Sequence, residues 1–181
     1  KVSAAQSDMR TLSLAIEGYA VDRHDYPLEM GPVEGPAGSY TGTPVQNAYG
    51  NTRLWGWKTA PTSLTTPVAY IASLPKDIFK EGAEGTFAPN EGLSFNSGNP
   101  LDMGYIYLDI ASWVEFENPQ FQPEWAKTVF GRWGLVSLGP DREYNIPQPT
   151  PDNSRPWVYD PTNGTVSSGI IVRTQNQVEV Q

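Results

Sequence analysis

The sequence contains no cysteine, so disulfide bonds, thiolate metal sites and cysteine nucleophiles are excluded. Basic residues are few: 12 Lys and Arg stand against 20 Asp and Glu, a formal net charge of −8. Because nucleic-acid binding needs a basic surface, we expect no nucleic-acid partner. The sequence also lacks a run of about 18 apolar residues that could cross a bilayer. Glycine patterns that cradle phosphates are missing too, so we expect no nucleotide cofactor.

Glycine and proline are abundant, with 17 residues of each among 181. Together with many Asn, Ser and Thr residues between short apolar runs, they predict turns, loops and brief strands. A helical bundle is thereby excluded. The length fits one domain, and we treat residues 1–181 as a single globular unit.

An amphipathic helix is predicted within residues 1–25, ending near Asp22 and before Pro27. Its apolar stripe has helical spacing and comprises Val2, Ala5, Met9, Leu12, Ile16 and Tyr19. No capping side chain with a turn before it opens this helix, so we expect the rod to continue upstream. We expect four stripe residues to pack on a sheet: Met9, Leu12, Ile16 and Tyr19. The opposite face is expected to be solvated or to meet neighbouring subunits, and it carries Arg10, Ser13 and Glu17.

Strand patterns follow this helix in the sequence, which predicts an α+β fold: a long N-terminal helix packed on an antiparallel sheet with long ordered loops. Residues 26–102 are interpreted as a loop region, with a short helix near 66–73. Residues 103–181 are interpreted as the sheet and C-terminal loops. The candidate strands are 105–110, 113–116, 133–138, 157–159 and 169–173. Aromatic residues expected to hold the loop 28–58 in place are Tyr40, Tyr49, Trp55 and Trp57.

Few residues suggest catalysis. The single histidine, His24, lies in a charged turn after the helix and is interpreted as a solvated surface group rather than a general base. Glu115 and Glu117 would project from one strand face, as the two carboxylates of a glycosidase can, although a solvent-facing edge explains them equally well. We therefore expect no enzyme, and a hydrolase using these two glutamates stays an alternative.

The aromatic content offers a second alternative, since six Trp and nine Tyr could form a platform on which sugar rings stack. Packing in the core and anchoring of loops is the commoner use of such residues. A carbohydrate-binding or adhesive β-domain of the cell envelope is therefore the alternative function, with Trp55 and Trp57 as its candidate residues.

Acidic and amide side chains gather in the C-terminal turns and could bind calcium, because hard cations prefer carboxylate and carbonyl oxygens. The candidate ligands are Asp141, Asp152, Asp160 and Asn163. No EF-hand spacing occurs, and the same residues suit turns closed by side-chain hydrogen bonds. Calcium is the only cofactor that the sequence suggests.

Four sequence segments share an order with one known family. Residues 8–27 carry the helix motif D-M-R-x-L-x-x-A-I-E-x-Y-x-x-D-x-x-x-Y-P, and residues 64–77 read LTTPVAYIASLPKD. Residues 133–141 read WGLVSLGPD, and residues 159–165 read YDPTNGT. The chain thereby resembles type IV pilin-like proteins, most closely the major pseudopilins of bacterial type II secretion systems. One departure is Ile78, which stands where the family usually has proline after the LPKD motif.

The resemblance implies a non-enzymatic filament subunit made with a short basic leader that a prepilin peptidase removes. About 20 apolar residues would follow, anchor the parent protein in the inner membrane and continue into the amphipathic helix. The domain would then lie in the periplasm of a bacterium. Implied partners are other pilin-like subunits in a homopolymer and the inner-membrane components of the secretion system. Without the apolar half, the chain is expected to be a soluble monomer.

Overall fold

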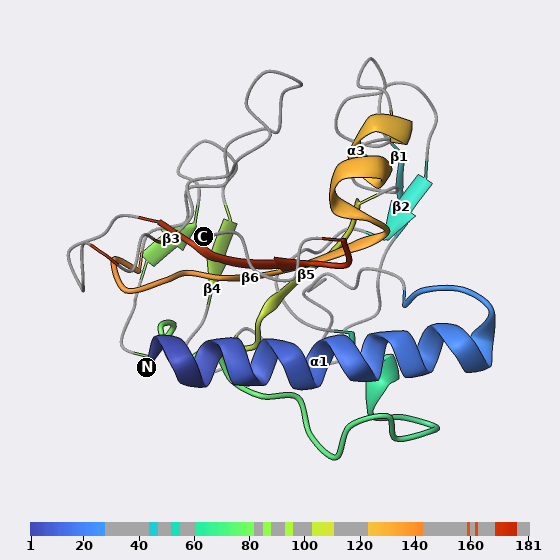
Figure 1. Ribbon diagram of the computed structural model, residues 1–181, viewed down its shortest axis with the longest axis horizontal. Coiled ribbons are helices and arrows are strands. Elements are labelled where there is room, and N and C mark those ends of the chain that lie inside the picture. Colours follow the sequence, from blue (N-terminus) through green and yellow to red (C-terminus); the bar gives the residue numbers. More distant parts are fainter. Residues whose placement is uncertain are drawn as a thin grey trace.

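The computed structural model describes residues 1–27, 44–46, 52–54, 61–81, 85–87, 93–95, 103–110, 123–142, 159, 162 and 169–176. These residues form an α+β arrangement (Figure 1). In chain order the elements are α1 (Val2–Arg23), β1 (Pro44–Gln46), β2 (Thr52–Leu54), the 3-10 helix η2 (Thr62–Leu64), β3 (Gly85–Phe87), β4 (Leu93–Phe95), β5 (Ile106–Asp109), α3 (Pro123–Phe130), β6 (Trp133–Ser137) and β7 (Ile171–Thr174).

The N-terminal helix α1 confirms the helix predicted from the apolar stripe. Its buried face consists of Ala5, Met9, Leu12, Ser13, Ala15 and Ile16. The helix ends where His24 adopts a left-handed conformation with φ of 59° and donates its backbone N–H to Ala20 O at 2.9 Å. A left-handed residue at this position satisfies one of the carbonyls that a helix end leaves free. Within the described part of the chain, no helix is both long and apolar enough to cross a membrane.

A three-stranded antiparallel sheet with the order β5-β6-β7 faces α1. Its register pairs Tyr107 with Leu135 and Leu135 with Arg173. Three predicted strands are confirmed with slightly shifted ends, because 105–110, 133–138 and 169–173 contain β5, β6 and most of β7. The predicted strand 113–116 lies outside the described residues, as do residues 157 and 158 of another. Tyr159, the last residue of that prediction, donates its N–H to Ile170 O at 2.9 Å.

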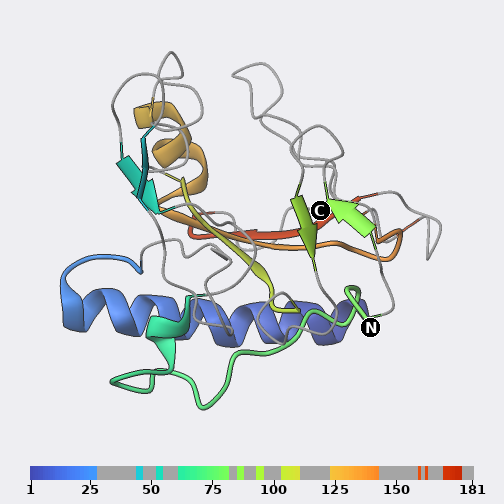
Figure 2. The same cartoon turned by 180° about the vertical axis from the view of Figure 1, so that it is seen from behind.

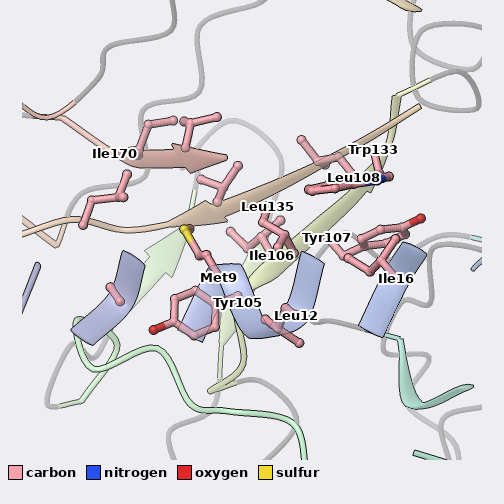
Figure 3. Close-up of a cluster of buried hydrophobic side chains, with 14 of the residues drawn as sticks. Met9, Leu12, Ile16, Tyr105, Ile106, Tyr107, Leu108, Trp133, Leu135 and Ile170 are labelled. Atoms are coloured by element: carbon pink, nitrogen blue, oxygen red, sulfur yellow. The ribbon is translucent and has the colours of Figure 1, made fainter. Parts of the chain in front are cut away.

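The helix lies between the sheet and the chain segment 61–81. Figures 1 and 2 both show α1 running along one face of β5, β6 and β7, with residues 61–81 passing on its other side. Figure 3 shows Met9 and Ile16 extending from α1 toward the side chains of the sheet. Leu64, from η2, is fully buried in the same core. The apolar stripe of α1 is therefore covered by the sheet and by the segment that follows η2.

The predicted short helix near 66–73 is wrong, since this segment consists of bends after η2. The N–H groups of Tyr70 and Ile71 both reach back to Leu64 O, at 2.9 and 3.2 Å, which closes a wide loop instead of helical turns. Pro67 and Pro75 leave room for about two turns, and so short a helix is marginal by itself. Tyr70, Ile71 and Leu74 pack against the core from the bends instead, while Val68 is exposed.

The description of residues 26–102 as a loop region with one helix is also wrong, because it contains two antiparallel hairpins, β1 with β2 and β3 with β4. Each of these strands has only three residues, too few to show an alternating pattern.

The helix α3, between β5 and β6, was not predicted within residues 103–181 (Figure 1). It begins with Pro123, a residue favoured at the first helical position. It ends at Gly131, whose φ is 83° and whose N–H donates to Lys127 O at 2.9 Å. Glycine is favoured at such a helix end because it adopts positive φ without strain. These start and stop signals could have identified the helix from the sequence.

Candidate functional site

The carboxylate of Glu17 joins α1 to the sheet. Its Oε1 accepts the indole N–H of Trp133 at 2.7 Å and the Gln175 amide at 3.1 Å. Its Oε2 accepts the hydroxyl of Tyr26 at 3.2 Å, and the Gln175 amide also donates to that hydroxyl. We call Glu17, Tyr26, Trp133 and Gln175 the Glu17 cluster. It connects the helix, the turn after it, the start of β6 and the residue that follows β7.

The prediction that Ser13 and Glu17 lie on a free face of the helix is therefore wrong. Ser13 is buried, donates to Arg10 O at 2.7 Å and accepts from Arg173 Nε at 3.3 Å. Arg10, the third residue of the predicted face, is exposed. The buried face of α1 is wider than its apolar stripe, because Arg173 of β7 and the indole of Trp133 need polar partners where they meet the helix.

Arg132 covers the outer side of the Glu17 cluster. Its guanidinium lies 5.6 Å from the centre of the Tyr26 ring and 3.6 Å from Asp25 Oδ1. Burial raises the pKa of the Tyr26 hydroxyl, and the nearby Glu17 carboxylate raises it further. The hydroxyl therefore stays protonated at neutral pH and remains a donor to Glu17.

A second polar group, Asp77, is fully buried at the far end of the sheet. Its Oδ1 accepts the Ser137 hydroxyl at 2.8 Å and the Phe79 N–H at 3.0 Å, and its Oδ2 accepts the Leu138 N–H at 3.1 Å. Burial raises the pKa of this carboxyl, although the hydrogen bonds and the charge of Lys80 act in the opposite direction. Asp77 thereby ties the LPKD motif to the end of β6.

Lys80 is buried beside this contact and donates its ammonium to Gly104 O. The N–H of Asp77 donates to Met103 O at 2.7 Å. Residues 77–80 are thus fixed both to the end of β6 and to the chain just before β5. Sequence reasoning missed this role for Asp77 and Lys80. The available signal was the position of Asp77 and Lys80 on either side of the apolar pair Ile78 and Phe79, where burial of charge requires partners.

The predicted helix-packing residues occupy the core or its edge. Met9, Leu12 and Ile16 are almost fully buried among residues of the sheet. Tyr19 is half-buried against the core, and its ring meets the Tyr70 ring edge-on with the centroids 5.5 Å apart. Tyr19 therefore also connects α1 to the segment 61–81.

Of the four candidate calcium ligands, only Asp141 lies in the described part of the chain. Its Oδ2 accepts the Gly169 N–H at 2.8 Å. This bond joins the chain after β6 to the chain before β7. Asp152, Asp160 and Asn163 lie outside the described residues. Among the residues that the structure describes, no group of three or more His, Asp or Glu side chains is arranged to hold a metal ion. Calcium binding stays a prediction.

The candidate catalytic and sugar-stacking residues are not brought together in the described regions. His24 is exposed at the end of α1. Glu115, Glu117, Trp55 and Trp57 lie outside the described residues, as do Tyr40 and Tyr49 of the predicted loop. Trp133 is 3% exposed, so its ring faces cannot stack on a sugar.

Two large apolar side chains of α1 point away from the core. Leu14 is 75% exposed and Val21 is 74% exposed. They are seven residues apart, close to two helical turns, and so share one face of the helix. Among the described residues, Leu14 and Val21 are the exposed large apolar side chains of α1.

Comparison of the chain with protein-family models, curated proteins and solved structures finds no match.

Proposed function

We propose that the chain is a non-enzymatic structural subunit of a type II secretion pseudopilus or a related type IV pilus-like filament. The observation that carries the proposal is that three motifs of the resemblance meet around one core. Glu17 of the helix motif accepts the indole N–H of Trp133, the first residue of WGLVSLGPD. Asp77 of the LPKD motif accepts the hydroxyl of Ser137 in that same segment. Motifs distant in sequence thus support each other in space.

The arrangement of α1 also supports a role in assembly. One face of the helix covers the sheet, whereas Leu14 and Val21 expose apolar area on another face. Exposed apolar patches on a helix suit contact with another protein surface. In the proposed filament, the helices of neighbouring subunits pack together and the sheet domains form the outer layer. ATP-driven inner-membrane components would add subunits, and the parent protein would be anchored with this domain in the periplasm.

The N-terminus of the gene product in its own cells tests the family assignment. We expect the gene to encode a short basic leader ending in glycine, followed by an apolar run of about 20 residues with Glu at its fifth position. Mass spectrometry of the purified protein should find cleavage directly after that glycine. A conventional export signal, or a gene product that begins near Lys1, would refute the proposal.

A further inference from the structure

The apolar contacts of α1 do not by themselves fix its position along its own axis. The fully buried apolar side chains Ala5, Met9, Leu12 and Ile16 follow one another at intervals of one helical turn. A shift of one turn, about 5.4 Å, would bring other apolar residues to three of these four positions in one direction and to two of them in the other. Shifts of this size between packed elements are known conformational changes in proteins.

The Glu17 cluster exists in only one of these positions. Its carboxylate receives donors from three parts of the chain, namely Tyr26, Trp133 and Gln175. A shift of one turn would replace Glu17 with a residue four positions away, Ser13 or Val21. Neither Ser13 nor Val21 can accept three hydrogen bonds. The indole N–H of Trp133 and the amide of Gln175 would therefore lose their acceptor at a half-buried site.

Other polar contacts of α1 include one with Tyr105 and one with Arg173. The hydroxyl of Tyr105 donates to Asp8 Oδ2 at 3.0 Å, and Arg173 Nε donates to Ser13 Oγ at 3.3 Å. At Glu17 three hydrogen bonds converge on one charged group of α1, and hydrogen bonds to charged groups are the stronger class. The cluster is thus a strong directional contact between α1 and the sheet.

We propose that the Glu17 cluster fixes the axial position of α1 and carries load along the helix axis between α1 and the sheet. The mechanical role rests on the proposed function, because a filament that pushes is loaded through its helices while the outer domains meet resistance. Glu17 acts here as a positioning residue. Under such load, apolar packing alone would let α1 slip by one turn. The helix can slip only after the Glu17 cluster has broken.

Constant-force pulling with optical tweezers tests this role on the chain itself. Because the sequence has no cysteine, handles can be attached at cysteines introduced by Lys1→Cys and Thr128→Cys. Figures 1 and 2 place α3 across the sheet from α1 and toward the C-terminal end of that helix, so a pull between the two handles has a component along the helix axis. We expect Glu17→Ala to unfold more than about tenfold faster at the same force, because it removes the acceptor of three hydrogen bonds and one hydrogen bond to a charged group corresponds to about that factor.

The matched control is Ile16→Val, which loses packing next to Glu17 but no hydrogen bond. For each variant, the acceleration of unfolding under load is compared with its acceleration of unfolding in urea without load, at one temperature. Tyr26→Phe, which removes one donor and keeps the ring, should give a smaller acceleration and replaces Glu17→Ala if that variant does not fold. The proposal is overturned if the Glu17 or Tyr26 variant unfolds no faster under load than the control. Since the measurement needs no filament, its failure would leave the proposed function standing.

Discussion

Replacement of Asp77 by alanine is expected to lower the free energy of unfolding by about 3 kcal/mol or more, since each buried donor left without an acceptor costs roughly 1–3 kcal/mol. The donors affected are the Ser137 hydroxyl and the N–H groups of Phe79 and Leu138. Asp77 is fully buried, so water does not reach the atoms that it satisfies. Urea unfolding followed by tryptophan fluorescence measures the loss.

Ser137→Ala is the matched control for Asp77→Ala. It removes one of the three donors together with its bond, so the expected loss is about 1 kcal/mol. Equal losses for the two variants would mean that Asp77 acts through Ser137 alone and would contradict its role as the tie between the LPKD motif and β6.

Gly139→Ala is expected to destabilise the chain by about 3 kcal/mol or more, or to prevent folding, because strain from a forbidden conformation and a backbone clash add together. Gly139 has a φ of 74°, and a Cβ built there would lie 2.0 Å from the carbonyl oxygen of Gly169. That neighbour is backbone, which cannot swing aside. Gly139 follows the end of β6. The loss of stability therefore arises in the same region that Asp77 holds through Ser137 and Leu138. Thermal and urea unfolding measure it.

Two other glycines give graded controls. At Gly131, with φ of 83°, the added Cβ would lie 2.5 Å from Gln175 Cβ, and we expect a loss that is smaller than at Gly139, where the contact is closer and is with backbone. At Gly18, inside α1, it would lie 3.4 Å from a Tyr70 ring carbon. Because alanine favours helices, Gly18→Ala is expected to be neutral or to stabilise by about 0.5–1 kcal/mol. A tolerated Gly139→Ala would contradict the close approach of the two chain segments.

The main elements could be predicted because their patterns are local. The apolar spacing from Val2 to Tyr19 identified α1, and apolar and β-branched runs identified the regions of β5, β6 and β7. The short helix near 66–73 was a misjudgement of the same kind of signal. A Thr-Pro pair can open a helix, but two turns are marginal by themselves, and the contacts of Tyr70 and Ile71 with the core and with Leu64 O fix the segment as bends.

The polar contacts could not be predicted, because their partners are far apart in sequence. Asp77 and Ser137 are 60 residues apart, and Glu17 and Trp133 are 116 apart. A helical stripe predicts which apolar residues are buried, but it does not predict which polar neighbours at its border receive donors from a sheet. For this reason Ser13 and Glu17 were assigned to the outside of the helix.

Cysteine cross-linking in cells tests the central claim, helix-mediated assembly, most directly. In the whole gene product, produced with its secretion machinery, Leu14→Cys and Val21→Cys together place two thiols on the exposed face of α1. We expect oxidation of a strain carrying both thiols on each subunit to give a ladder of multimers on denaturing gels, because neighbouring helices approach each other. Thr128→Cys on α3 serves as the control and should give far less product. Monomers alone from the α1 thiols, with the protein present at normal levels, would contradict the account.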